Sequence, residues 1–200
     1  MKLSVIIPVY NQEELVIRAL DSIPRRDDIE VIVIDDASID NTWNSLLEYR
    51  KKHFEEINIV LLYNEDNMGV GYTLNKGYDV ASGEYIVLLG SDDYFTEEFE
   101  NSLNELDGTD LIYFNLKDNT GKIWEVTPKT KNILVGSVKF MRRDFIGNTR
   151  CPEIRAVEDY YFYQELMKKN PTEKFTNKVI KHYNYPRKGS LSYMHKRGEI

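Results

Sequence analysis

The sequence predicts an α/β protein in which a doubly wound, mostly parallel central sheet is flanked by helices and is followed by a smaller second half. Apolar runs alternate with segments of helical spacing over residues 1–95. The runs have no polar face, and such strands are typical of a parallel sheet covered on both sides. The alternation ends after residue 95 without a Pro-, Gly- or Ser-rich spacer, so we expect one domain over 1–200 with a change of topology inside it.

In the first half, strands and helices are expected to alternate. The apolar runs predict strands at 3–9, 30–35, 57–63 and 84–90. Spacing near 3.6 residues predicts helices at 12–23, 42–54 and 70–81. The helix over 70–81, for example, places Leu74, Tyr78 and Ala81 on one face. This order is that of a doubly wound α/β unit.

The second half is more mixed. We expect a polar helix at 96–106, strands at 110–116 and 122–126 joined by the turn DNTG, and helices at 137–146 and 157–169. The tail, 181–200, is basic and aromatic and shows little periodicity.

Composition excludes several classes of protein. A net charge of −7 argues against a nucleic-acid surface. The single cysteine cannot form an internal disulfide, and no apolar stretch approaches the roughly 20 residues that span a bilayer. The N-terminus also lacks the features of a signal peptide, so a cytoplasmic location is expected.

Adjacent carboxylates follow two of the expected strands. Asp35 and Asp36 end one strand, and Asp92 and Asp93 follow another. Because the carboxyl ends of parallel strands share one edge of the sheet, these side chains are expected to converge there. Helix capping explains a single pair. Two converging pairs repel each other unless a cation relieves them, which indicates Mg²⁺ or Mn²⁺ with open positions for phosphate oxygens. Tyr10 could then stack on a base.

A further carboxylate lies at the start of the last expected helix. Helical spacing puts Asp159 beside Phe162, Tyr163 and Leu166, on the face that packs inward. One interpretation is an acidic residue that interacts favourably with the helix dipole. The other is a general base that faces a cleft.

Four motifs together resemble glycosyltransferase family 2. They are SVIIPVYNQEE, EVIVIDDASIDNT, NMGVGYTLNKGYDVASGEYIVLLGSDDYF and CPEIRAVEDYYFYQEL, and they occur in the family's order. The resemblance covers residues 3–95 and, less closely, 137–192. It implies a GT-A fold with a nucleotide-binding half (1–95) and an acceptor-binding half with a C-terminal tail (96–200). It also implies an enzyme that transfers a sugar with inversion of configuration.

The resemblance assigns roles in the nucleotide site. It places Pro8 and Tyr10 around the nucleobase and makes Asp36 the group that binds the base, usually uracil. Asn67 matches the stretch before the fourth strand, and Asp92 would lie near the ribose.

The remaining roles concern the metal, the diphosphate and the acceptor. Asp93 would hold Mn²⁺ or Mg²⁺, Arg187 would help to cover the diphosphate, and Asp159 would be the catalytic base. His182 or His195 could complete the metal shell, although a surface imidazole is the simpler explanation for each. The tail around Gly189 and Ser190 suits a lid over the nucleotide, and its basic and aromatic residues could instead touch an anionic membrane surface.

Departures from the family pattern shape the predicted function. Gly90 stands where the family often has a further Asp, which lowers the expected metal affinity. The Gln-x-x-Arg-Trp element of processive synthases is absent, which indicates transfer of a single sugar. The resemblance implies that this sugar is a hexose or N-acetylhexosamine and that the donor is a nucleotide sugar, expected to be a UDP-sugar. The expected acceptor is a glycan or lipid-linked hydroxyl in surface polysaccharide or glycolipid synthesis, reached by peripheral contact at the inner face of the membrane.

Two other functions stay open. A nucleotide-sugar-binding module without catalysis, part of a larger assembly, is one alternative. Nucleotidyl transfer is the other, although Tyr10-Asn11-Gln12 stands where such enzymes carry a Gly-rich signature with a basic residue.

Overall fold

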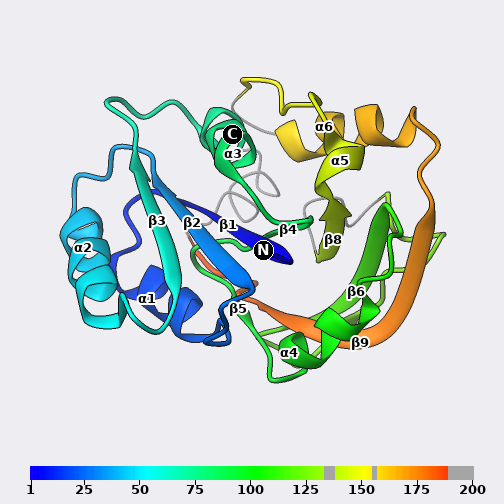
Figure 1. The fold of residues 1–200 in the computed structure, drawn as a ribbon, viewed down its shortest axis with the longest axis horizontal. Coiled ribbons are helices and arrows are strands. Elements are labelled where there is room, and N and C mark those ends of the chain that lie inside the picture. The colour runs from blue at the N-terminus through cyan, green and yellow to red at the C-terminus, as the bar shows by residue number, and fades with distance from the viewer. Residues whose placement is uncertain (133–137, 155–156, 189–200) are drawn as a thin grey trace.

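A single mixed sheet runs through both halves of the protein. The computed structural model describes residues 1–132, 138–154 and 157–188 (Figure 1). Within these residues the sheet has nine strands in the order β3-β2-β1-β4-β8-β6-β9-β5, and β7 pairs with β6. No helix in this part of the chain is long and apolar enough to cross a membrane.

The first half has the predicted doubly wound arrangement. Its parallel strands are β1 (Leu3–Val9), β2 (Ile29–Asp35), β3 (Asn58–Tyr63) and β4 (Tyr85–Leu88). Its helices are α1 (Glu13–Asp21), α2 (Thr42–His53) and α3 (Val70–Val80). All seven elements were expected from the sequence, and β1 lies at the centre of this half, between β2 and β4.

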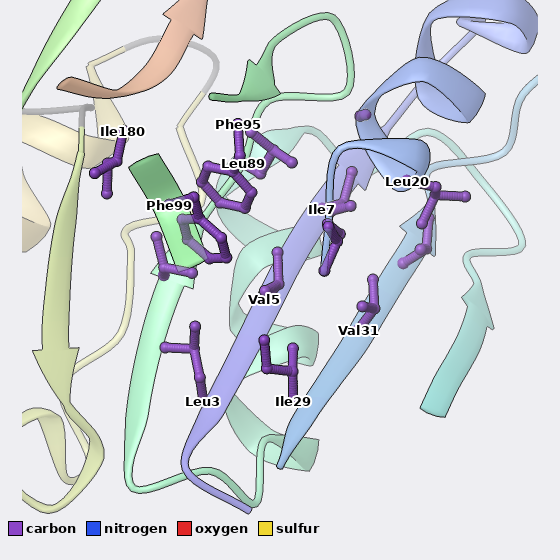
Figure 2. Close-up of a cluster of buried hydrophobic side chains, with 14 of the residues drawn as sticks. Leu3, Val5, Ile7, Leu20, Ile29, Val31, Leu89, Phe95, Phe99 and Ile180 are labelled. Atoms are coloured by element: carbon purple, nitrogen blue, oxygen red, sulfur yellow. The ribbon is translucent and has the colours of Figure 1, made fainter. Parts of the chain in front are cut away.

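Both faces of these strands are buried, as the apolar runs predict. Successive side chains of a strand point to opposite faces. Leu3, Val5 and Ile7 therefore enter one core cluster with α1, α2 and α4, as Figure 2 shows in part. Ile6 enters the other cluster with α3 and α6. The two clusters hold the helices on opposite sides of the sheet.

The second half completes the sheet with strands of both directions. Its elements are β5 (Tyr94–Phe95), α4 (Glu98–Ser102), a 3₁₀ turn η1 (Leu103–Glu105), β6 (Leu111–Asp118), β7 (Ile123–Trp124), β8 (Lys139–Arg142), α5 (Arg143–Ile146), α6 (Glu158–Met167) and β9 (Glu173–Tyr183). β8 runs antiparallel to both β4 and β6, whereas β9 runs parallel to β6. The expected strands at 110–116 and 122–126 correspond to β6 and β7.

The prediction of a helix at 137–146 is wrong over most of that segment. The segment forms β8 and only then a single turn, α5. Phe140 and Met141 enter opposite core clusters, which is the alternation of a strand. As a strand, this segment pairs with both β4 and β6. These long-range backbone hydrogen bonds outweigh the local preference for a helix, because the helical periodicity extends over only a few residues.

β9 has no counterpart among the expected elements. Its sequence, EKFTNKVIKHY, is mostly polar and lacks a strand-like apolar run. It pairs with β6 along its length and with β5 near its end, so the sheet rather than local sequence fixes its conformation. The helix expected at 96–106 is also shorter, because α4 tightens into η1.

Candidate active site

The carboxyl ends of β1 and β2 form one side of the candidate site. The Asp36 N–H donates to the Val9 carbonyl at 2.9 Å, and Pro8 lies in register with Ile34. Immediately beyond, Asn11 and Ala37 have φ of 51° and 61°. Left-handed backbone is unfavourable for residues with a side chain, and such strain concentrates at functional sites.

The Asp36 carboxylate holds the loop that precedes α3. Its Oδ1 accepts from Asn64 Nδ2 at 2.8 Å and from the Met68 N–H at 2.9 Å, and its Oδ2 accepts from the Gly69 N–H at 2.8 Å. Gly69 has φ 86°, which glycine adopts without penalty. A carboxylate has about four acceptor positions. Asp36 therefore keeps one, on Oδ2, for a donor from a ligand.

Tyr10 and Asn67 lie at the rim of this region. Tyr10 directly follows β1 and is 42% exposed. Asn67 is exposed and precedes Met68, which is bonded to Asp36. The structure thus brings Pro8, Tyr10, Asp36 and Asn67 to one edge of the sheet.

The second acidic pair follows β4, on the other side of β1. Asp93 is 3% exposed. Its Oδ2 lies 2.9 Å from Lys181 Nζ, and its Oδ1 accepts from the Asn184 N–H at 2.9 Å. Asp92 Oδ2 accepts from Arg187 Nε at 3.0 Å, and Arg187 Nη2 lies 2.8 Å from it. Each carboxylate therefore already has a cationic partner from β9 or from the segment after it.

Gly90 leaves room for these two carboxylates. A Cβ at this position would lie 3.2 Å from Asp92 Oδ1 and 3.2 Å from Asp93 Oδ2. Such contacts require the neighbours to shift. An Asp at position 90 would also add a third like charge, so the glycine matches the packing found here.

The donor set at Asp92 and Asp93 suits a hard divalent cation that shares its shell with phosphate oxygens. Both groups are carboxylates, and both hold cations in this structure, the Lys181 ammonium and the Arg187 guanidinium. Among the described residues no group of three or more His, Cys, Asp or Glu side chains could enclose a metal. A Mg²⁺- or Mn²⁺-like ion bound by one or two carboxylates and by a diphosphate fits this arrangement.

The predicted base lies at the first turn of α6. The N–H of Tyr160 donates to Asp159 Oδ1 at 2.7 Å, and the preceding Val157 has φ 61°. Phe162, Tyr163 and Leu166 are buried, as the helical spacing predicts. Asp159 itself is half-buried at the start of the helix.

Helix α3 connects the start of α6 to the loop that Asp36 holds. A Cβ on Gly71, in the first turn of α3, would lie 3.4 Å from Glu158 Cβ. Gly71 is two residues beyond Gly69, which donates to Asp36. Asn75, further along α3, exchanges two hydrogen bonds with the Cys151 backbone at 2.8 and 2.9 Å. Burial also raises the pKa of Glu158. These contacts place the start of α6 next to the loop that Asp36 holds.

Two buried lysines were missed by the sequence analysis: one pairs with Asp93, and the other lies close enough to Asp159 to be influenced by its charge. Lys139 on β8 is 7% exposed and Lys181 on β9 is 4% exposed. Phe140, next to Lys139, enters the cluster on the opposite face, so Lys139 points toward the α3 and α6 side. Lys181 follows an irregularity in the pairing of β9 with β6 and lies in register with Leu116 and Phe95. Burial lowers the pKa of Lys139 to about 8, the nearby charge of Asp159 opposes this shift, and that of Lys181 adds to it. The available signal for Lys139 was its place between Val138 and Phe140, within a short run of apolar residues.

The structure does not show whether His182 or His195 completes the predicted metal shell. His182 stacks on Tyr94 with ring centroids 4.5 Å apart, and its Nδ1 is buried without a partner in the described chain. His195 and the lid positions Gly189 and Ser190 lie outside the described residues.

Comparisons with known proteins agree with this geometry. The model of the family "Glycosyl transferase family 2" matches residues 4–178. The chain is 38% identical over 102 residues to poly(ribitol-phosphate) beta-glucosyltransferase of Bacillus spizizenii, which covers 49% of this chain but only 16% of that relative.

Solved structures give the fold. Staphylococcus aureus TarS 1–349 in complex with UDP-GlcNAc has a TM-score of 0.80 at 25% identity, over 95% of this chain and 60% of that one. Mannosyltransferase PcManGT from Pyrobaculum calidifontis, in complex with GDP-Man and Mn²⁺, has a TM-score of 0.77 over 99% of this chain and 61% of that one, and at 19% identity it supports the fold alone. These likenesses confirm the expected GT-A fold.

Proposed function

Because the chain belongs to glycosyltransferase family 2, we propose that it transfers a single hexose or N-acetylhexosamine from a UDP-sugar to an acceptor hydroxyl, with inversion at the anomeric carbon. The observation that supports this proposal is the arrangement of β2 and β4 on either side of β1, with Asp36 and the Asp92–Asp93 pair after their carboxyl ends and the start of α6 packed against α3. The halves 1–95 and 96–200 then supply the nucleotide and the acceptor sides.

The nucleoside would bind at the ends of β1 and β2. The acceptor position left on Asp36 Oδ2 suits the N–H of uracil. Tyr10, 42% exposed, would stack on the base, and Pro8 and Asn67 would complete the pocket wall. The TarS structure named above was solved with UDP-GlcNAc, which supports a uridine nucleotide here.

The diphosphate would bind where cations outnumber carboxylates. Arg18 donates to the Asp92 carbonyl at 2.5 Å, and Lys181 and Arg187 pair with Asp93 and Asp92. These three cations attract a diphosphate and stabilise it as a leaving group. Asp93 is the carboxylate that would hold Mn²⁺ or Mg²⁺, with Asp92 nearer the ribose. The ion, when bound, supplies Lewis-acid neutralisation of the departing diphosphate.

Asp159 would remove the acceptor proton. In the displacement, a bond forms between the acceptor oxygen and the anomeric carbon while the bond from that carbon to the diphosphate oxygen breaks, and the proton passes to Asp159. A positioned base contributes about 10²–10⁴-fold to such a step. The acceptor is proposed to be a surface polysaccharide or glycolipid at the inner face of the membrane, in line with the poly(ribitol-phosphate) named for the relative.

The test is the Asp159→Asn variant. We expect transfer from UDP-GlcNAc or UDP-glucose to fall by about 10²–10⁴-fold while UDP binding stays within about twofold of the parent. Glu165→Gln, also on α6 but with an exposed side chain, is the matched control and should keep full activity. Transfer by Asp159→Asn at the parent rate would refute the role of the base. Donor binding by the parent without transfer or hydrolysis would indicate the non-catalytic module instead.

A further inference from the structure

Lys181 is a buried cation bound to the carboxylate that the reaction would need for a metal. Its Nζ lies 2.9 Å from Asp93 Oδ2, and the two side chains are 6% and 5% exposed. We propose that Lys181 is the resident counter-cation of Asp93, which a divalent metal displaces only together with the donor diphosphate, and that the released ammonium then binds the diphosphate. This inference rests on the proposed function and adds a positioning residue to it.

The two oxygens of Asp93 have different partners, a backbone N–H on Oδ1 and the ammonium on Oδ2. Asp93 Oδ1 accepts from the backbone N–H of Asn184 at 2.9 Å, and this bond fixes the plane of the carboxylate whichever cation is present. Oδ2 is the oxygen that Lys181 occupies. Asp93 would hold the metal, and a dication on this carboxylate would repel an ammonium that lies 2.9 Å from Oδ2.

The charged groups near Lys181 determine where its ammonium can move when a metal displaces it. Lys139 is buried close enough for the charge of Lys181 to contribute to lowering its pKa, so movement toward Lys139 brings two cations together. Breaking a buried ion pair without replacement leaves an uncompensated charge, which is strongly unfavourable. A diphosphate at the strand ends provides that replacement for Lys181, while the metal provides it for Asp93.

Two consequences follow for binding. Metal without nucleotide must compete with an ammonium already in place, so it should bind weakly. Metal and UDP should strengthen each other's binding by the same factor, since coupling between two ligands is reciprocal. Arg187 and Asp92 form a similar pair, but at 25% and 22% side-chain exposure water already screens it.

The experiment measures binding of MnCl₂ to the whole chain by electron paramagnetic resonance of free Mn²⁺, with and without UDP. We compare the parent with Lys181→Gln, which keeps a hydrogen-bond donor but removes the charge. Lys178→Gln is the matched control, since Lys178 lies on the same strand but pairs with Glu98 and Glu105. We expect Mn²⁺ alone to bind Lys181→Gln at least tenfold more tightly than it binds the parent or Lys178→Gln. The strengthening of Mn²⁺ binding by UDP should shrink correspondingly.

Equal affinity of Mn²⁺ for folded Lys181→Gln and for the parent would overturn the inference. Lys181→Arg, which retains a cation, should bind bare Mn²⁺ as weakly as the parent does. If Lys181→Gln does not fold, the parent itself decides: Mn²⁺ that binds equally well with and without UDP also overturns the exchange. The titration with bare metal needs neither sugar nor acceptor, so a failure of sugar transfer is distinguishable from a failure here.

Discussion

Replacing Asp36 with Asn tests both the loop geometry and the nucleotide site. The native carboxylate accepts three hydrogen bonds, two on Oδ1 and one on Oδ2, at 2.8–2.9 Å. Asn has a single acceptor oxygen. If that oxygen keeps the bonds from Asn64 and Met68, the new amide NH₂ faces the N–H of Gly69, and two donors oppose each other.

The size of the effect follows from these contacts. Leaving the part-buried N–H of Gly69 unpaired costs about 1–3 kcal/mol, and the two surviving bonds lose the extra strength that a charged acceptor gives. We therefore expect Asp36→Asn to lower the free energy of unfolding by about 3 kcal/mol. For a chain of 200 residues this corresponds to a fall in Tm of about 6–12 °C.

Differential scanning calorimetry of the parent, Asp36→Asn and Asp66→Asn measures the fall. Asp66 is exposed in the same loop, which makes it a matched control with an expected change below about 0.5 kcal/mol. Isothermal titration with UDP should show weaker binding for Asp36→Asn alone. A Tm for Asp36→Asn equal to that of Asp66→Asn would refute the proposed role of Asp36 in holding the loop.

Two further predictions concern buried polar groups. Because the pKa of Lys139 falls from 10.5 to about 8, the unfolded chain binds more protons between these values, and this group should raise stability by up to about 3 kcal/mol as pH rises from 8 to 10.5. Lys139→Met should remove that rise in urea denaturation at pH 8, 9 and 10, and parallel curves for the parent and the variant would contradict it. The Tyr78 hydroxyl is buried without a partner in the described chain, and its ring stacks on Phe162 at 5.1 Å. Tyr78→Phe should therefore raise the Tm by about 2–4 °C, since it removes about 1 kcal/mol of unmet hydrogen bonding, and a lower Tm in a thermal scan would indicate a partner for the hydroxyl.

The parallel strands, and the place of the acidic pairs after the carboxyl ends of two of them, could be predicted from the sequence because both depend on local information. An apolar run such as LSVIIPV predicts a strand that is buried on both faces. In a parallel sheet the carboxyl ends of such strands share one edge, which places the end of this strand beside the ends of β2 and β4, where the acidic pairs follow. The position of Asp159 at the start of a helix with one buried face was predicted in the same way, from helical spacing. Its role as the base stays a prediction.

The tertiary structure alone decided which partners those carboxylates have. β8 and β9 form strands because their backbones hydrogen-bond to β4 and β6. Their own sequences are too short or too polar to predict a strand. The ion pair of Lys181 with Asp93 depends on that pairing, since only the register of β9 brings the two side chains together in the interior. Periodicity reports which face of an element is buried, whereas the charge that meets a carboxylate there is set by contacts between distant segments.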